Sequence, residues 1–589
     1  MLKRYLTLIA FAIFCNSAGA QSLVYNLLKD IGSGYSSYPY GLTAFNGSVY
    51  FFASNNPSNA NQLALWKTDG TTDGTQMLKD SIGSGFEGGL PELVVFNGQL
   101  YFLSVMYGID FFTAMLWTSD GTTAGTQIVK TSTRSSSIGG SDGQAASCSL
   151  IPFNNKLYFN FYDADGGMEP WFTDGTTAGT DILINIATDQ IPGALPSSSP
   201  QSFTVFGNAL YFWANPNTNN GPKAQLWKSD GTSAGSESLG EFYEDASTYR
   251  KSSLVGYNGK LYFSARTSDV SGYELYAADG TVFGFQQVKI LNPGTLNGGD
   301  GVSPIFNAKI FNNRLYFWGF DPASGHELWS TDGTTAGTLL LANTNASNIA
   351  SLNNAFYNSD PFFVYGGKLY YANNDGINGK EPWVTDGTTA GTQLLANLAP
   401  TSQGSIGLWN PGYYIFNGRL HLRGSISGSP EIISVDTSTN TISRYFFESG
   451  EQGFLYADVP YDFSSSNYDR FSMVELNGKL IFPAGYSEVP AAITEFDFEL
   501  MMLEPSITTS IKNVQQSAQV FPVPSSNWLF VEKLQAGITP SVYDITGRII
   551  AIVANPNGDA GNWKFDVSSL APGLYYLQAG KTSVRFIKN

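Results

Sequence analysis

Short apolar runs separated by turn residues recur along most of the chain. The first run, Val49-Tyr50-Phe51, follows the turn Phe45-Asn46-Gly47. Asn-Gly between two apolar runs is typical of a tight β-hairpin, because both residues tolerate a positive φ. Counterparts of the run are spaced 51 to 60 residues apart, so the pattern predicts nine repeat units. They lie at Leu100–Phe102, Leu157–Phe159, Leu210–Phe212, Leu261–Phe263, Leu315–Phe317, Leu369–Tyr371, Leu420–Leu422 and Leu480–Phe482.

A second motif follows the run in the first seven units. In unit one Leu65-Trp66 precedes Asp69-Gly70-Thr71, and Gly74-Thr75 ends the block. Asp-Gly favours a second hairpin, and the Thr hydroxyls are suited to cap nearby backbone groups. Unit five has Tyr276 in place of Trp, and units eight and nine lack the motif. The residues of this structural repeat motif are Trp66, Asp69, Gly70, Trp117, Asp120, Gly121, Trp171, Asp174, Gly175, Trp227, Asp230, Gly231, Trp329, Asp332, Gly333, Trp383, Asp386 and Gly387.

Each unit therefore predicts four short antiparallel strands. In unit one we expect them at about 42–45, 49–54, 63–68 and 76–79. Four strands in a unit of this length are typical of a propeller blade, and the aromatic residues would fill the space between stacked blades. The predicted fold class is all-β: a β-propeller of about eight to nine four-stranded blades with a small C-terminal β-sandwich.

The two ends of the repeat region predict how the ring closes. The N-terminal segment 27–34 repeats the pattern of the fourth strand of unit one at 77–85, whereas unit nine offers only about three strands. An N-terminal strand that completes the last blade would close the ring and remove exposed sheet edges. Nine blades exceed the usual four to eight. Eight blades with an accessory hairpin, two smaller propellers and an open solenoid remain as alternatives.

The repeat motif also carries a resemblance. The block Glu327-Leu328-Trp329-Ser330-Thr331-Asp332-Gly333-Thr334 and the block from Leu116 to Thr126 resemble the ELWxxDGT repeat family of bacterial surface proteins. The resemblance covers roughly residues 22–500 and recurs seven times. It implies export and a repeat fold, and it implies no agreed chemistry.

The pattern changes after residue 504. Residues 505–517 are expected to form a linker, and residues 518–589 contain short alternating strands of a small β-sandwich. This stretch resembles the type A C-terminal sorting domain of the type IX secretion system. The family's turn motif corresponds to Tyr543, Asp544, Gly547 and Arg548, and its Gly-x-Tyr motif corresponds to Gly573 and Tyr575. The resemblance implies passage across the outer membrane, followed by retention on the surface or release.

The N-terminus has the pattern of a signal peptide. Lys3 and Arg4 precede an apolar segment at 6–15 that is too short for a lasting membrane helix. Cleavage is expected between Ala20 and Gln21. The predicted domains are thus a signal peptide at 1–20, the propeller at 21–504, the linker at 505–517 and the sorting domain at 518–589. Cleavage leaves Cys148 as the only Cys, so no internal disulfide is expected.

Composition narrows the class of partner. The 589 residues are 14% aromatic and 13% charged, with a net charge of −17 and a pI near 4.6. An acidic surface repels phosphate backbones, so nucleic acid is not expected as a partner. The expected partners are the type IX machinery and an extracellular glycan or protein. No transmembrane segment is expected in the mature chain.

Few residues point to catalysis. His326 and His421 are far apart in sequence, and each is interpreted as an ordinary surface or packed histidine rather than a base of a triad. Nothing near Cys148 would activate a thiol. We therefore expect no catalytic residue, no cofactor and no metal site.

Repeated carboxylates are the remaining candidates. Glu169, Glu274, Glu327 and Glu381 occupy one position of the repeat, where units one, two and four have Ala64, Met115 and Gln225. The preferred interpretation is structural: these side chains accept hydrogen bonds at strand starts. The alternative is calcium bound at the neighbouring oxygen-rich turns, although the spacing differs from that of a calcium loop.

The leading functional hypothesis is a non-enzymatic binding protein that holds a glycan or protein through loops on one face. The longer and less regular loops are expected near 107–114, 131–147, 187–201, 292–302 and 342–361. The alternatives are a polysaccharide hydrolase or lyase with two close carboxylates, and a structural adhesin or matrix component.

Overall fold

The computed structural model describes residues 23–32, 36–55, 62–84, 91–108, 111–135, 150–163, 167–188, 197–216, 223–243, 253–268, 272–292, 308–345, 362–398, 412–426, 429–437, 439, 441–444, 472–486, 497–505, 519–521, 528–532, 541–544, 549–550, 554–556, 563–579 and 582–588. The chain divides into two compact units, Met1–Ser506 and Ile507–Asn589. Among the described residues no helix is long and apolar enough to cross a membrane. The predicted signal peptide and its cleavage site at Ala20 and Gln21 lie outside the described residues, as does Cys148.

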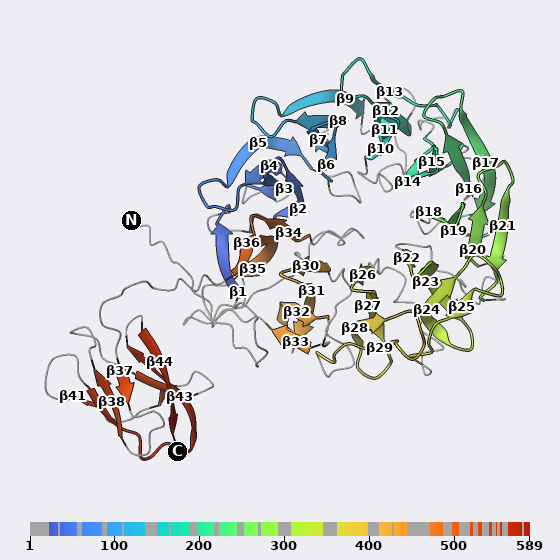
Figure 1. The fold of residues 1–589 in the computed structure, drawn as a ribbon. Helices are drawn as coiled ribbons and strands as arrows, with labels where there is room; N and C mark the ends of the chain where they lie inside the picture. Colours follow the sequence, from blue (N-terminus) through green and yellow to red (C-terminus); the bar gives the residue numbers. More distant parts are fainter. Residues whose placement is uncertain are drawn as a thin grey trace. The chain divides into compact units, whose positions relative to one another are not determined.

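The first unit is a nine-bladed β-propeller (Figure 1). Each blade is a four-stranded antiparallel sheet whose first strand lies innermost in the ring and whose fourth strand lies outermost. The first strands of blades one to nine are β2 (Tyr40–Phe45), β6 (Val94–Phe96), β10 (Ile151–Phe153), β14 (Gln201–Phe206), β18 (Val255–Tyr257), β22 (Lys309–Phe311), β26 (Phe363–Tyr365), β30 (Tyr414–Phe416) and β34 (Val474–Leu476).

The second and third strands form the centre of each blade. The second strands are β3 (Ser48–Ser54), β7 (Gln99–Tyr107), β11 (Lys156–Asp163), β15 (Ala209–Ala214), β19 (Lys260–Ala265), β23 (Arg314–Asp321), β27 (Lys368–Asn374), β31 (Arg419–Ile426) and β35 (Lys479–Tyr486). The third strands are β4 (Leu63–Thr68), β8 (Phe111–Ser119), β12 (Gly167–Thr173), β16 (Lys223–Ser229), β20 (Glu274–Ala278), β24 (Gly325–Thr331), β28 (Lys380–Thr385), β32 (Ser429–Asp436) and β36 (Asp497–Pro505).

The fourth strands form the outer edge of the ring. They are β5 (Gln76–Gly83), β9 (Gln127–Ser135), β13 (Thr180–Ile182), β17 (Ser236–Tyr243), β21 (Phe285–Lys289), β25 (Leu339–Leu340), β29 (Gln393–Leu394), β33 (Thr441–Arg444) and, in blade nine, β1 (Leu23–Lys29). The tight turn between the first and second strands is an Asn-Gly pair in five of the nine blades. In blade one, for example, φ is +45° at Asn46 and +73° at Gly47.

The ring closes as the sequence predicts. Strand β1 pairs antiparallel with β36, from Leu23 opposite Pro505 to Lys29 opposite Leu500. The N-terminal strand therefore supplies the fourth strand that unit nine lacks. This pairing excludes the open solenoid, and the single nine-bladed ring excludes the eight-bladed and the two-propeller alternatives.

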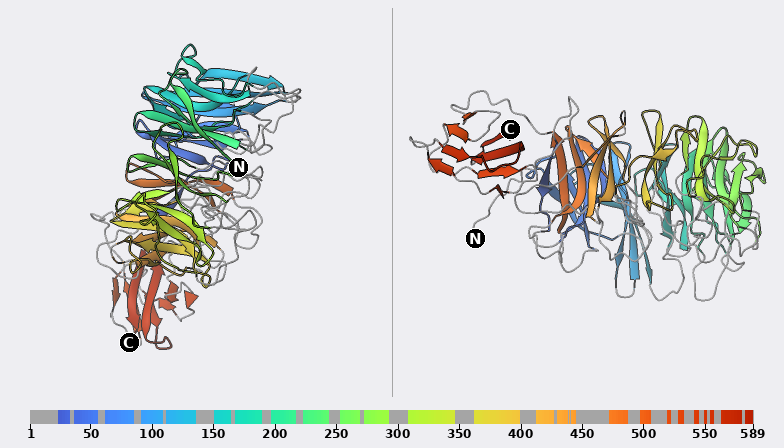
Figure 2. Two further views of the ribbon diagram at one scale, coloured as in Figure 1. Left: turned by 90° about the vertical axis from the view of Figure 1, so that its right-hand side faces the viewer. Right: turned by 90° about the horizontal axis from the view of Figure 1, so that it is seen from below.

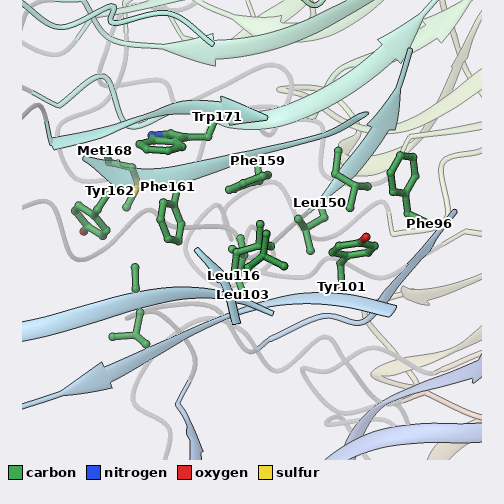
Figure 3. Close-up of a cluster of buried hydrophobic side chains, with 14 residues drawn as sticks. Phe96, Tyr101, Leu103, Leu116, Leu150, Phe159, Phe161, Tyr162, Met168 and Trp171 are labelled. Carbon is green, nitrogen blue, oxygen red and sulfur yellow. The ribbon is translucent and has the colours of Figure 1, made fainter. Parts of the chain in front are cut away.

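The core consists of apolar layers between neighbouring blades. In the layer between blades two and three, Leu103 and Leu116 of blade two face Phe159, Phe161 and Trp171 of blade three (Figure 3). The layer at the closure is built in the same way, with Leu28 of β1 buried among residues of blades one and nine. Since a blade's sheet has both faces covered only by its neighbours, closure completes the last layer.

The second unit contains two four-stranded sheets. The first has the order β37 (Gln519–Phe521), β38 (Trp528–Glu532), β42 (Trp563–Asp566), β41 (Ala554–Pro556), and the second has the order β40 (Ile549–Ile550), β39 (Ser541–Asp544), β43 (Gly573–Ala579), β44 (Thr582–Lys588). Leu529 and Phe565 of the first sheet are buried, as are Val542 and Leu577 of the second. Two sheets with buried apolar residues are what a small β-sandwich requires.

Candidate functional site

The propeller has two chemically different faces. On one, which we call the turn face, lie the Asn-Gly turns and the Asp-Gly-Thr turns. On the other, the loop face, lie the hairpins between second and third strands, the ends of the fourth strands and the starts of the first strands. All five segments expected as longer loops leave strands on the loop face. Their central parts lie outside the described residues, so only their flanking strands are placed.

The Asp-Gly-Thr turn is a hydrogen-bonded unit that repeats with little change. In blade one the Asp69 carboxylate accepts hydrogen bonds from the backbone N–H and the hydroxyl of Thr71, at 2.9 and 2.6 Å. The Thr71 Oγ1 in turn accepts the N–H of Gly74 at 2.9 Å. Hydrogen bonds from the side chain and then the backbone of Thr71 lower the pKa of Asp69. The same contacts hold Asp120, Asp174, Asp230, Asp332 and Asp386.

The Gly of each turn receives a side chain from the preceding blade. The Tyr158 hydroxyl of blade three donates to the carbonyl of Gly231 in blade four at 3.2 Å. A Cβ at Gly121, Gly175, Gly231, Gly280, Gly333 or Gly387 would overlap the hydroxyl of the Tyr on the neighbouring blade. Gly70 has no such Tyr; there Lys479 of blade nine donates to its carbonyl at 3.3 Å. The Gly is therefore needed for blade stacking as well as for its positive φ.

The motif Trp residues also lie at the contacts between neighbouring blades, which we call seams. Trp117 stacks on Phe102 of its own blade, with ring centroids 5.8 Å apart, and Lys79 of blade one lies 5.9 Å from the Trp117 ring. Lys130 and Lys289 approach Trp171 and Trp329 in the same way, at 5.3 and 5.5 Å. Trp171, Trp329 and Trp383 are buried, and Trp66 and Trp227 are half-buried. The side chains of the repeat motif thus hold neighbouring blades together, and these contacts indicate a structural role for the motif.

The repeated glutamates hold the segment that follows the fourth strand. Glu169 accepts the N–H groups of Ile186, Ala187 and Ser198 and the Ser198 hydroxyl, at 2.6 to 3.2 Å. Glu274, Glu327 and Glu381 accept N–H groups 17 or 18 residues further along the chain. Their hydrogen-bond partners agree with the structural interpretation. Among the described residues no three His, Cys, Asp or Glu side chains are grouped closely enough to hold a metal ion.

A fifth glutamate of this kind was not identified from the sequence. Glu499 in β36 accepts hydrogen bonds from Ile31, Gly32 and Ser37 at 2.7 to 3.2 Å, and so fixes the segment after β1. The signal was present, since Glu499-Leu500-Met501 matches Glu-Leu-Trp with Met in place of Trp. Burial raises the pKa of both Glu169 and Glu499 to about 7, against the opposing effect of these hydrogen bonds.

On the turn face, the Asp-Gly-Thr turn of blade five differs from the turns of the other blades and has a strained backbone. In blades six and seven the hydroxyls of Thr335 and Thr389 donate to the carbonyls of Val288 and Leu341 in the preceding blade, at 2.7 and 2.6 Å. Blade five has Val282 at this position, which has no hydroxyl. The backbone N–H of Phe283 instead donates to the equivalent carbonyl of Leu239 at 2.7 Å, with φ at +58°. The Phe283 side chain is consequently 75% exposed.

Blade two presents an exposed apolar hairpin end with two aromatic rings on the loop face. Residues 107–114 were expected to form an irregular loop; that expectation is wrong, because β7 and β8 extend to Tyr107 and Phe111. These light-blue strands project beyond those of the other blades in Figure 2. Met106, Tyr107 and Phe111 are 44, 51 and 47% exposed. We call Met106–Tyr107 and Phe111–Thr113 the blade-two hairpin.

The blade-two hairpin is joined to the core through its rings. The Tyr107 and Phe112 ring centroids are 6.4 Å apart, and Phe112 packs edge-on against the buried Tyr162 of blade three at 4.8 Å. Phe112 lies against the same layer of buried residues that Figure 3 shows between blades two and three. Exposed aromatic side chains on a rigid support are typical of binding surfaces.

The two histidines are separate, with His421 buried and His326 half-buried. His326 lies in β24 of blade six and His421 in β31 of blade eight, and burial lowers the pKa of each to about 4. Both are therefore neutral near pH 7. The structure does not bring the two histidines to one site.

Comparisons with known proteins give distant structural neighbours and one matching family. Solved structures similar to the chain include a puromycin hydrolase, which is 15% identical over 77% of this chain and 58% of that chain with a TM-score of 0.37. They also include the β-propeller domain of the Trilobed protease from Pyrococcus furiosus, which is 10% identical over 61% of this chain and 99% of that chain with a TM-score of 0.29. This chain thus spans less than two thirds of the puromycin hydrolase. No curated protein matches it in sequence.

Residues 519–589 match the family described as the secretion system C-terminal sorting domain. The chain is therefore a β-propeller protein with a type IX sorting domain. Such a domain directs export across the outer membrane, so the protein belongs on the cell surface or in the extracellular space. Of the sorting-motif residues, Tyr543 and Asp544 lie in β39 and Gly573 and Tyr575 in β43; Gly547 and Arg548 lie outside the described residues.

Proposed function

We propose that the propeller is an extracellular binding protein without catalytic activity, which holds a glycan or a protein on its loop face. The observation that carries this proposal is the contrast between the two faces. The turn face is built from near-identical hydrogen-bonded turns, with the exposed Phe283 of blade five as an exception, whereas the loop face displays Met106, Tyr107 and Phe111. Variable connections on a rigid scaffold are where binding residues usually lie.

The finer identity of the repeats and of the N-terminus belongs to the same proposal. We propose that the repeats are members of the ELWxxDGT family and that residues 1–20 are a signal peptide removed after Ala20. Adhesion through a bound glycan or protein would fit a protein that the type IX system delivers to the cell surface. Calcium remains the alternative for the oxygen-rich turns, and it is not required by the proposed binding.

The experiment that tests the proposed function is a binding screen joined to an activity screen. The purified mature protein is applied to a glycan array, used to capture surface proteins, and incubated with polysaccharides that are then assayed for new reducing ends and unsaturated products. We expect binding without any shortening of the polysaccharide. Turnover of a polysaccharide would favour the hydrolase or lyase. If the folded protein binds neither a glycan on the array nor a surface protein, the result would favour a structural adhesin.

A further inference from the structure

We propose that the ligand of the blade-two hairpin is a neutral polysaccharide whose sugar rings present apolar faces, as in β-linked glucans, xylans and chitin. This inference rests on the proposed binding function and assigns to it a site and a ligand class. It follows from the side chains that share one side of the hairpin, from their support and from their lack of charge.

One side of the hairpin combines the Phe111 ring with hydroxyls. Met106 pairs with Thr113, and Thr113 pairs with Thr133 of β9, so these three side chains point to the same side of the sheet. Phe111 lies two residues before Thr113 and points the same way. The hydroxyls of Thr113 and Thr133 are 2.9 Å apart, and Thr133 is exposed. An aromatic face beside hydroxyls matches a pyranose, which has an apolar face of C–H groups and an equatorial rim of hydroxyls.

The rings are held in place before any ligand arrives. A Cβ at Gly108 would lie 2.7 Å from the Phe111 ring, so the absence of a side chain at Gly108 lets that ring rest against the hairpin backbone. The N–H of Gly108 donates to the Phe111 carbonyl at 2.7 Å and fixes the hairpin end. On the opposite side Tyr107 is supported through Phe112 and Tyr162. A preorganised surface loses little conformational entropy on binding.

The charge of the protein distinguishes neutral from anionic polysaccharides as candidate ligands. The side chains of Met106, Phe111, Thr113 and Thr133 carry no ionisable group, and the whole chain has a net charge of −17. A protein of this charge repels uronic-acid and sulfated polymers at low ionic strength. These four uncharged side chains therefore fit a neutral polymer rather than an anionic one.

The test measures retention of the full mature protein on cellulose, chitin and xylan, with alginate and pectin as anionic comparisons. We expect retention on at least one neutral polymer and a loss of roughly tenfold in affinity for Phe111→Ala, because a stacked ring acts as a binding anchor. Phe111→Trp should retain binding because it keeps a ring, and Tyr107→Ala, on the opposite side of the hairpin, should lower the affinity less than Phe111→Ala does. Phe283→Ala, which removes an exposed ring from the turn face, should leave binding unchanged.

The outcomes separate this inference from the proposed function. Binding to a neutral polymer that survives Phe111→Ala, with a normal thermal unfolding midpoint, overturns the hairpin assignment and leaves the binding function standing. Retention only on alginate or pectin, or on none of the five polymers, overturns the ligand class. Shortening of any polymer overturns the proposed function itself.

Discussion

At the scale of single residues, the repeat motif acts by contacts with the next blade. The Gly of each Asp-Gly-Thr turn leaves room for a Tyr hydroxyl, and the Trp lies under a Lys of the preceding blade in three seams. Sequence alone explains the Asp and Thr by local turn chemistry. It does not reveal the Tyr–Gly contact, because the partners are about seventy residues apart, as Tyr158 and Gly231 are.

The strain at Phe283 could not be predicted for a similar reason. Its positive φ follows from a hydrogen bond to Leu239, a residue of another blade, and from the missing hydroxyl at Val282. A sequence pattern reports only that Val-Phe replaces the more common Thr-Ala. Long-range partners of this kind decide local conformation in ways that propensity does not capture.

The buried glutamates predict a pH dependence of stability. Burial raises the pKa of Glu169 to about 7 from an ordinary value of 4.5. A raised folded-state pKa means that the native chain holds a proton that the unfolded chain has released, so this contribution to stability is complete below about pH 4.5 and is lost as the pH rises through about 7. The thermal midpoint of the wild type should therefore fall relative to that of Glu169→Gln across this interval.

The measurement is a series of thermal unfolding curves for both proteins over that pH range. Glu237→Gln, at an exposed position of β17, is the matched control and should follow the wild type. A constant difference between wild type and Glu169→Gln at every pH would contradict the assignment of the slope to Glu169.

At the scale of elements, the sequence predicted the hairpins, but it did not predict how far strands extend into the connections between them. The Asn-Gly and Asp-Gly pairs place the strands of blade one within two residues for three of the four, and β5 runs four residues further than expected, to Gly83. The blade-two hairpin was missed because its strands continue without a repeated pattern past the length of the other blades. Strand length here depends on packing against blade three, which the local sequence does not report.

The closing strand gives an element-scale prediction. Leu28 is fully buried where β1 completes blade nine, and Leu78 is its counterpart in β5 of blade one. Leu28→Asp buries an unpaired carboxylate and should destabilise the fold by at least about 3 kcal/mol. Because β1 then detaches, we also expect rapid protease cleavage near the N-terminus, read by mass spectrometry of the fragments.

The control for this experiment is Leu78→Asp. It places the same carboxylate in a comparable layer without releasing the closing strand, so its early cleavage sites should lie elsewhere. The closure would not depend on β1 if both variants were cut at the same sites and rates.

At the scale of the whole molecule, export is assigned to the second unit, and the proposed binding belongs to the first. The sorting-domain match is confined to residues 519–589, and the motifs that predict it are local. Deleting residues 513–589 should therefore leave the protein inside the cell envelope, measured by immunoblotting of cell and medium fractions. Phe283→Ala in the full chain should be exported normally, and normal appearance of the deletion variant in the medium would contradict the role of this domain.

The pairing of β1 with β36 has a consequence for how the chain folds. A seam between neighbouring blades joins residues about as close as Thr43 and Leu93, 50 positions apart, whereas Ile31 and Glu499 are separated by 468. The chain entropy lost on forming a contact grows with the logarithm of the loop, so the closing contact costs roughly 2 kcal/mol more than any other seam. Blades should therefore assemble in order, and closure should be the last and slowest step. Until it occurs, the first strand of the chain and the last blade each expose an unpaired edge, and an aggregation-prone interval follows directly from the topology of the ring.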